Sequence, residues 1–156
     1  MTDAIKIITS NKKATFEYHI EERFEAGLVL TGTEVKSLRA GKANLQEAYC
    51  NVESGEMILR GCHIAPYDHG NRANHDPIRT RKLLLHRREI EKLDKAARQK
   101  GYTIVPVKLY FKNGRAKIEI GLGKGKKLYD KRADIAERDS NRRLDRLKSE
   151  MGRRGD

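Results

Sequence analysis

Two runs of alternating apolar and polar residues lie side by side late in the chain. In the first run, "TIVPVKLYF", the alternating apolar residues are Val105, Val107, Leu109 and Phe111. In the second, "RAKIEIGL", they are Ala116, Ile118, Ile120 and Leu122. Between them stands Asn113-Gly114, which supplies the positive φ angles of a tight hairpin turn. This pattern predicts an antiparallel hairpin over residues 103–122 with one buried face.

Earlier segments predict further strands. Residues 16–30 are rich in aromatic and β-branched residues at both ends and contain no helix stop, which predicts a long strand or a bent strand pair. The stretch "AYCNVESGEMILRG" predicts two short strands around a Ser54-Gly55 turn. Residues 67–80 are polar and contain Gly, Asn, Asp and Pro, so we expect a loop that is longer than most.

Two segments carry helical signals. Thr33 can cap a helix of two turns that Gly41 terminates. The stretch "RKLLLHRREIEKLDKAARQKG" runs into a longer helix that Gly101 closes. Its positions at i, i+3 and i+4 spacings are Glu89, Ile90, Leu93 and Ala97.

The predicted elements suit a small barrel followed by a tail. Short antiparallel strands with one or two helices favour an OB-type Greek-key barrel over residues 1–122, with a mixed α+β sandwich as the alternative. Residues 123–156 hold few apolar residues and cannot bury enough surface to offset chain ordering. We therefore expect 123–156 to be a basic tail that is disordered alone and folds as a helix against a partner.

Charge narrows the class of partner. Among 156 residues, 34 Lys and Arg stand against 22 Asp and Glu, a net charge of +12. Such an excess points to phosphate-bearing partners. No apolar run approaches the ~20 residues that span a bilayer, and the N-terminus does not resemble a secretory signal. Cys50 and Cys62 suggest no disulfide framework, so we expect two reduced thiols in a cytoplasmic protein.

The sequence offers little support for an enzyme. "GLGKGKK" resembles a phosphate-binding loop, but its glycines lie one residue out of step and no Ser or Thr follows the lysine. We interpret Gly123 and Gly125 as a hinge by which the chain leaves the barrel. The histidines and cysteines lack metal-ligand spacing, and the candidate nucleophiles lie in no triad context. We expect no catalytic residue, no metal and no cofactor.

Five basic clusters favour nucleic acid as the partner. They are "NKK" (11–13), "KSLRAGK" (36–42), "RTRK" (79–82), "HRR" (86–88) and "KGKK…DKR" (124–132), and the tyrosines interleaved with them are Tyr67, Tyr110 and Tyr129. No recognition helix for double-stranded DNA is evident, so a structured RNA fits better. A general single-strand binding module remains the alternative, although nine Phe and Tyr residues and no Trp supply few stacking platforms.

Several motifs resemble those of a known family. "NKKATFEYHIEERFEAGLVLTGTEVKSLRAGKANL", "RTRKLLLHRREI", "GYTIVPVKLYFKNGRAKIEIGLGKGKKLYDKR" and "ADIAERD" closely resemble the SmpB family of SsrA-binding proteins, the bacterial partners of transfer-messenger RNA. The resemblance implies an OB-type barrel that grips the tRNA-like part of this RNA. It also implies delivery, with elongation factor Tu and GTP, to the A site of stalled ribosomes for trans-translation. We expect a monomer that probes the mRNA channel with its tail.

The resemblance also implies residue roles. The predicted RNA-binding residues are Asn11, Lys12, Lys13, Glu25, Lys36, Arg39, Arg79, Arg81, Lys82, Leu83, Leu84, Leu85, Lys124, Lys126 and Lys127. Those predicted to meet the ribosomal decoding centre are Tyr129, Asp130, Lys131 and Arg132. Glu25 is expected to accept from base or ribose donors or to orient an arginine, with a surface salt bridge as the alternative. Arg39 and Arg81 are expected to contact phosphate or to stack.

Overall fold

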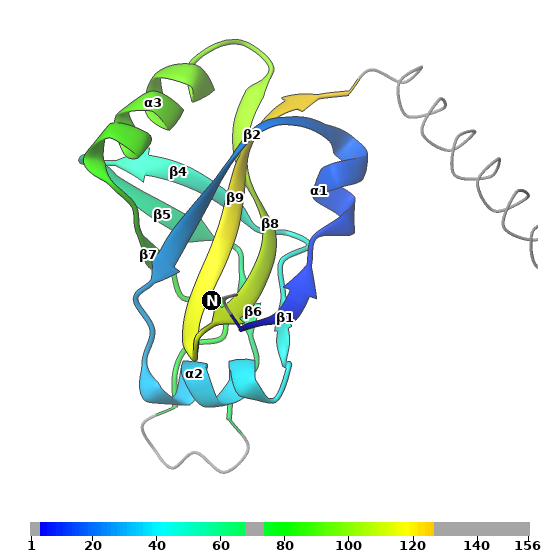
Figure 1. Ribbon diagram of the computed structural model, residues 1–156, viewed down its shortest axis with the longest axis vertical. Coiled ribbons are helices and arrows are strands. Elements are labelled where there is room, and N and C mark those ends of the chain that lie inside the picture. The colour runs from blue at the N-terminus through cyan, green and yellow to red at the C-terminus, as the bar shows by residue number, and fades with distance from the viewer. Residues whose placement is uncertain (1–3, 68–73, 127–156) are drawn as a thin grey trace, which may run out of the picture. The chain divides into compact units, whose positions relative to one another are not determined.

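The computed structural model describes residues 4–67 and 74–126 (Figure 1). Its elements are β1 (Ile5–Ser10), α1 (Lys12–Glu17), β2 (Tyr18–Leu28), α2 (Gly32–Arg39), β3 (Ala43–Asn44), β4 (Tyr49–Glu53), β5 (Glu56–Arg60), β6 (His63–Ile64), β7 (Arg81–Leu84), α3 (Arg87–Ala97), β8 (Tyr102–Lys112) and β9 (Arg115–Gly125).

The main sheet closes on itself. Its strand order is β1-β8-β4-β5-β7-β2-β9, and a further pairing of β8 with β9 joins the two ends into a barrel, with β1 added outside β8. All its pairings are antiparallel. The prediction of a mainly antiparallel β fold is therefore confirmed, while its OB-type topology stays a prediction. In Figure 1, α2 lies across one end of the barrel and α3 lies at the other.

The predicted hairpin is confirmed and is longer than expected. Asn113 and Gly114 have φ angles of 51° and 80°, as the turn requires. The expectation that every alternating residue of β8 shares one face is wrong. A register shift between Pro106 and Lys108 interrupts the pairing with β9, so Val107 leaves the alternation. As a result, Ile104, Leu109 and Phe111 belong to the main hydrophobic core, and Val105 and Val107 are buried elsewhere.

The strands β4 and β5 around the Ser54-Gly55 turn are confirmed, as are both predicted helices. The cap of α2 differs from the expectation: Thr31, not Thr33, is its N-cap, and Glu34 completes a capping box with it. Five elements were missed: β1, α1, β3, β6 and β7. Helix α1 includes the first two residues of the strand predicted over 16–30, and β7 lies where the sequence pattern predicted only helix.

The two cysteines are free and buried, as expected. Burial raises the pKa of Cys50, and burial also raises the pKa of Cys62 to about 11. Both thiols therefore stay protonated at neutral pH and act as small apolar groups of the core.

Candidate nucleic-acid interface

Three hollows follow one another along β1 and α1. The first is lined by Ala4, Ile5, Lys6, Arg39, Phe111 and Gly114. The second is lined by Thr9, Ser10, Asn11, Lys12, Lys13, Ala43, Asn44 and Gln46. The third is lined by Asn11, Lys13, Ala14, Glu17, Tyr18, Gln46, Glu47, Ala48, Tyr49, Thr103 and Val105. We call these hollows together the β1–α1 groove.

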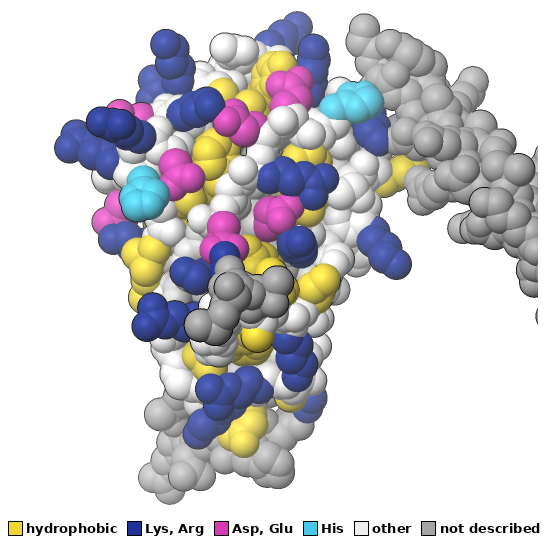
Figure 2. All heavy atoms as spheres, viewed as in Figure 1, with side chains coloured by type: hydrophobic (Ala, Val, Ile, Leu, Met, Phe, Trp, Pro, Cys, Tyr) yellow, Lys and Arg dark blue, Asp and Glu magenta, His cyan; other side chains and the backbone are white. Residues whose placement is uncertain are grey.

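The first two hollows are basic. Lys6 and Arg39 lie in the first, and Lys12 and Lys13 lie in the second. At the end of the molecule that carries α2, Figure 2 shows Lys and Arg side chains and no Asp or Glu among the described residues on this face. A row of cations along a groove tracks a phosphate backbone. The structure thus brings Arg39, which is distant in sequence from Lys12 and Lys13, onto the same side of the barrel.

Asn11 lies in this groove, but its side chain is a structural group. Its amide donates to the carbonyl oxygens of Leu45 at 3.1 Å and Pro106 at 3.0 Å, and its Oδ1 accepts from the N–H of Ala14 at 3.1 Å. Only 4% of Asn11 is exposed. The predicted direct RNA contact by Asn11 stays a prediction, because all three of these hydrogen bonds are made inside the protein. Through them Asn11 holds α1 against β8 and the loop at Leu45.

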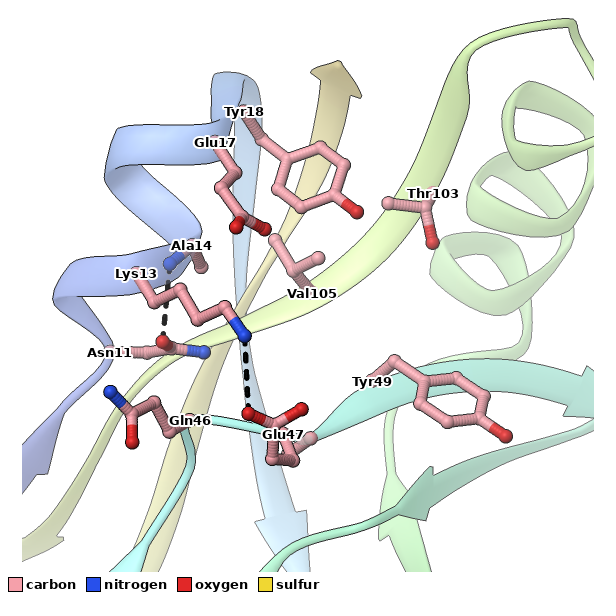
Figure 3. A pocket seen from close by; sticks show the side chains of 11 residues that line it. Asn11, Lys13, Ala14, Glu17, Tyr18, Gln46, Glu47, Tyr49, Thr103 and Val105 are labelled. Carbon is pink, nitrogen blue, oxygen red and sulfur yellow. Dashed lines mark hydrogen bonds and ion pairs between the residues drawn. The ribbon is translucent and has the colours of Figure 1, made fainter. Parts of the chain in front are cut away.

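The third hollow combines charged and aromatic side chains (Figure 3). Lys13 Nζ lies 3.1 Å from Glu47 Oε1, which ties α1 to the segment before β4. This hydrogen bond raises the pKa of Lys13, so the ammonium stays charged throughout the neutral range. Tyr18 and Tyr49 lie on opposite sides of the hollow.

Glu25 is an exposed residue of β2 that lines none of the three hollows. The hydroxyl of Tyr110 donates to Glu25 Oε2, and Lys112 Nζ lies 3.3 Å from Glu25 Oε1. The hydrogen bond from Tyr110, together with Lys112, lowers the pKa of Glu25 and keeps it ionised. The surface salt bridge that the sequence left as an alternative is therefore present. Tyr110 is only 3% exposed, so it is not the stacking platform that its place among basic residues suggested.

Arg81 is fully buried, and its predicted contact with phosphate or stacking stays a prediction. Its guanidinium pairs with the buried carboxylate of Glu34 and donates to the carbonyl oxygens of Cys62 at 2.8 Å and Arg79 at 3.0 Å. Arg79 shares that carboxylate at 2.6 Å. These residues join α2 to β7 and β6 inside the protein, as a buried ionic cluster.

The remaining predicted residues of β7 have mixed environments. Leu83 is a core residue at 1% exposure, Leu85 packs against the core, and Leu84 is 53% exposed. Lys82 is exposed and lies 3.1 Å from Glu56. Lys82 and Leu84 are therefore the exposed side chains among residues 81–85.

Two other predicted lysines stand over tyrosine rings. Lys36 Nζ lies 5.4 Å from the ring centre of Tyr67, and Lys124 Nζ lies 5.8 Å from that of Tyr102. Each pair is in the range of a cation–π contact. Lys36 and Lys124 are exposed, on α2 and β9 respectively, and Lys126 follows β9.

The expected hinge at Gly123 and Gly125 is corrected, because both glycines belong to β9. Gly123 pairs with Ile20 on one side and with Thr103 on the other, and Gly125 is the last residue of the strand. A Cβ at Gly121 would lie 2.5 Å from Ile20 Cγ2, and one at Gly123 would lie 3.0 Å from Tyr18 Cβ. The glycines at 121 and 123 thus allow side chains of β2 to lie directly on β9.

We expect Gly121→Ala to lower the free energy of unfolding by about 1–3 kcal/mol, because Ile20 is β-branched and moves away only at a cost. The matched control is Gly125→Ala, since nothing lies within 4 Å of a Cβ there; it should change stability by less than ~0.5 kcal/mol. Urea unfolding of both variants measures this. Equal stability of the two would contradict the packing role of Gly121.

Several predicted residues lie outside the described residues. They are Lys127, Tyr129, Asp130, Lys131 and Arg132, together with the rest of the tail. Among residues 4–67 and 74–126, no group of three or more His, Cys, Asp or Glu side chains could hold a metal ion. Within the same ranges no helix has the length and apolarity to cross a membrane.

Among the groove residues that sequence reasoning missed are Lys6, Glu17, Tyr18 and Tyr49. Tyr18 stands in the run "FEYHI", where an aromatic residue reads as part of a buried strand. Tyr49 is the first residue of β4, although it is 49% exposed. Nothing in the local sequence indicated that these two rings meet across one hollow, since α1 was not expected.

Comparisons with known proteins agree with the resemblance found in the sequence. The family model described as SmpB protein matches residues 8–150. An SsrA-binding protein of Geobacter metallireducens is 62% identical over 139 residues, which cover 89% of this chain and 91% of the relative. One from Bacillus pumilus is 57% identical over 141 residues, covering 90% of each chain.

A solved structure gives the same result. It comes from work described as "tmRNA-SmpB: a journey to the center of the bacterial ribosome", is 49% identical, and has a TM-score of 0.66. The likeness covers 77% of this chain and 85% of that one. Because the family model spans most of the sequence and the relatives are more than half identical over about nine-tenths of their length, this chain belongs to the SmpB protein family.

Proposed function

We propose that this chain binds the tRNA-like part of transfer-messenger RNA and delivers it to the A site of stalled ribosomes in trans-translation. The observation that carries the proposal is its 49% identity to a solved SmpB chain described together with tmRNA and the bacterial ribosome. The chain acts as an adaptor and not as an enzyme. It works in the cytoplasm as a monomer, and elongation factor Tu with GTP reaches it through the RNA.

The β1–α1 groove is the surface that we assign to the RNA backbone. Lys6, Lys12, Lys13 and Arg39 line it, and Lys12 and Arg39 are exposed. The net charge of +12 adds a long-range attraction to a polyanion. Glu25, Lys36, Lys82, Leu84, Lys124 and Lys126 are proposed as further contacts. Lys127 and the segment Tyr129–Arg132 are proposed to meet RNA and the decoding centre.

We expect the double substitution Lys12→Ala with Lys13→Ala to weaken binding to transfer-messenger RNA and to lower the salt dependence of log K by about 2, one for each lost phosphate contact. Fluorescence anisotropy at 50–200 mM KCl measures both. The control is Lys95→Ala with Lys100→Ala, two exposed lysines of α3 and the turn after it. An unchanged salt slope in the first variant would remove the groove from the RNA interface.

The same titration tests the function itself. The wild-type chain should bind transfer-messenger RNA more tightly than an unrelated hairpin RNA of equal length at every salt concentration. Equal affinity for the two RNAs would contradict the adaptor proposal. Equal affinity for single-stranded DNA as well would favour a general single-strand binding module.

A further inference from the structure

The third hollow of the groove is large enough to be considered as a binding pocket. It has a volume of about 290 Å³ and is bounded by α1 and the start of β2 on one side and by residues 46–49 on the other. Drug-sized ligands occupy pockets of roughly 300–1,000 Å³. The hollow therefore has room for one ring system. In Figure 3, Glu17 and Tyr18 face Gln46, Glu47 and Tyr49 across it.

Two tyrosines supply flat walls. A Cβ built at Gly123 would lie 3.0 Å from Tyr18 Cβ and 3.2 Å from Tyr18 Cγ, so β9 packs against Tyr18 from one side. Tyr18 is thereby held in place while it lines the hollow. Tyr49 is 49% exposed, which is a large fraction for an aromatic side chain. Aromatic side chains in such places stack on unpaired bases of RNA.

Some polar side chains of the hollow have hydrogen-bond partners in the described part of the chain and others do not. Lys13 is paired with Glu47 at 3.1 Å. Within residues 4–67 and 74–126, no hydrogen bond is found to the side-chain oxygens of Glu17, Tyr18 or Tyr49. Glu17 feels the charge of Lys13, one helical turn away on α1, but forms no ion pair with it at bonding distance. Among the described residues, the half-buried carboxylate of Glu17 thus lines the hollow without a hydrogen-bond donor.

We propose that this hollow binds a single unstacked guanine of the RNA, with Glu17 as the residue that selects the base. A carboxylate has two acceptor oxygens and no donor. Only guanine presents two neighbouring N–H donors, N1 and N2, on its Watson–Crick edge. Adenine and cytosine each offer one donor beside an acceptor, and uracil places its donor between two acceptors. Glu17 therefore matches guanine in a bidentate contact.

The inference rests on the proposed function and adds a base preference to it. The test uses the full-length protein, labelled with ¹⁵N, and titrates it in turn with the 5′-monophosphates of guanosine, adenosine, cytidine and uridine. Guanosine monophosphate should shift the amide signals of residues 14–18 and 46–49 with an affinity about tenfold above the other three, the discrimination expected of one bidentate pair. Equal shifts with all four nucleotides would overturn the proposal.

Two substitutions separate selection from stacking. Glu17→Gln should abolish the preference for guanosine monophosphate, since an amide offers one acceptor and one donor in place of two acceptors. Tyr49→Ala should weaken all four nucleotides by a similar factor and leave the preference intact, because stacking tolerates every base. The matched control is Glu91→Gln, an exposed carboxylate on α3. A preference that survives in Glu17→Gln would contradict the role of this carboxylate.

The same variants are then bound to transfer-messenger RNA. If Glu17→Gln binds it about tenfold more weakly than Glu91→Gln does, the hollow serves the proposed function. If wild type binds this RNA selectively but shows no guanine preference, the base site is wrong and the proposed function stands. If the wild-type protein does not prefer this RNA over an unrelated hairpin, the proposed function is wrong, and the base site loses the function on which it rests.

Discussion

Substitution of Arg81 by methionine should lower the free energy of unfolding by about 3–5 kcal/mol, because it leaves a buried carboxylate without its closest partner. Arg81 and Glu34 are both fully buried. The guanidinium also donates to the carbonyl oxygens of Cys62, Arg79 and Pro77, which would lose a donor inside the protein. Thermal unfolding should show a decrease in Tm of roughly 10–20 °C.

The matched control for this prediction is Arg98→Met. Arg98 also pairs with a carboxylate, Asp94, at 3.1 Å, but its side chain is 79% exposed. An exposed pair of this kind contributes less than ~1 kcal/mol. An outcome in which Arg81→Met has the wild-type Tm but binds RNA weakly would contradict this prediction. Arg81 would then be an RNA-contact residue, as the family resemblance implied.

The buried ionic cluster of Glu34, Arg79 and Arg81 also makes the free energy of unfolding depend on pH. Burial alone raises the pKa of Glu34, but hydrogen bonds from Arg79, the Thr31 backbone and Arg81 outweigh it and lower this pKa to about 2. A carboxylate with a depressed pKa in the folded state stabilises the protein above its unfolded pKa, which is near 4.5. That contribution should fall away between about pH 5 and pH 2, and Glu34→Gln should flatten the pH profile of unfolding in this window.

Removal of residues 127–156 should abolish tagging of peptides on stalled ribosomes and leave binding of transfer-messenger RNA within about threefold, a change near 0.6 kcal/mol. The cut is placed after Lys126 because β9 runs to Gly125, whose N–H donates to the Gly101 carbonyl at 3.0 Å. A cut after Gly123 would remove strand residues. A tagging assay in a reconstituted translation system, beside an RNA-binding titration, measures the two activities separately.

A narrower variant sharpens this test. Alanine at Tyr129, Asp130, Lys131 and Arg132 in the full-length chain should lose tagging as the truncation does, if these residues meet the decoding centre. The truncated chain has lost the charge of the tail, so its RNA affinity should be compared at 200 mM KCl, where nonspecific attraction is weak. A loss of RNA affinity beyond about tenfold, near 1.4 kcal/mol, would assign the tail to the RNA interface.

Local sequence patterns were sufficient to predict the elements whose contacts join residues close together in the sequence. The hairpin of β8 and β9 followed from two alternating runs and an Asn113-Gly114 turn, all of which act within a few residues. The turn at Ser54-Gly55 and the amphipathic helix α3 followed in the same way. In α2, the capping box was signalled by Thr31 and Glu34, and the prediction erred by two residues because Thr33 offers the same chemistry.

Other elements depended on partners that are distant in sequence. The strand β7 was hidden because "RKLLL" before a helix looks helical, and only its pairing with β5 and β2 makes it extended. The single-residue shift in β8 moved Val105 and Val107 out of the face that alternation had assigned to them. Local spacing carries no signal of either event.

The amino-acid sequence by itself determined the antiparallel hairpin, the excess of positive charge and the family, since composition and motif order do not depend on distant contacts. Only the tertiary structure decided which charged side chains are exposed to solvent. Arg81 and Lys12 are both basic residues in basic clusters, yet one is buried beside Glu34 and the other is exposed in the groove. Burial is set by which strands pair, and a charge inside the protein needs a partner, whereas one outside is solvated by water.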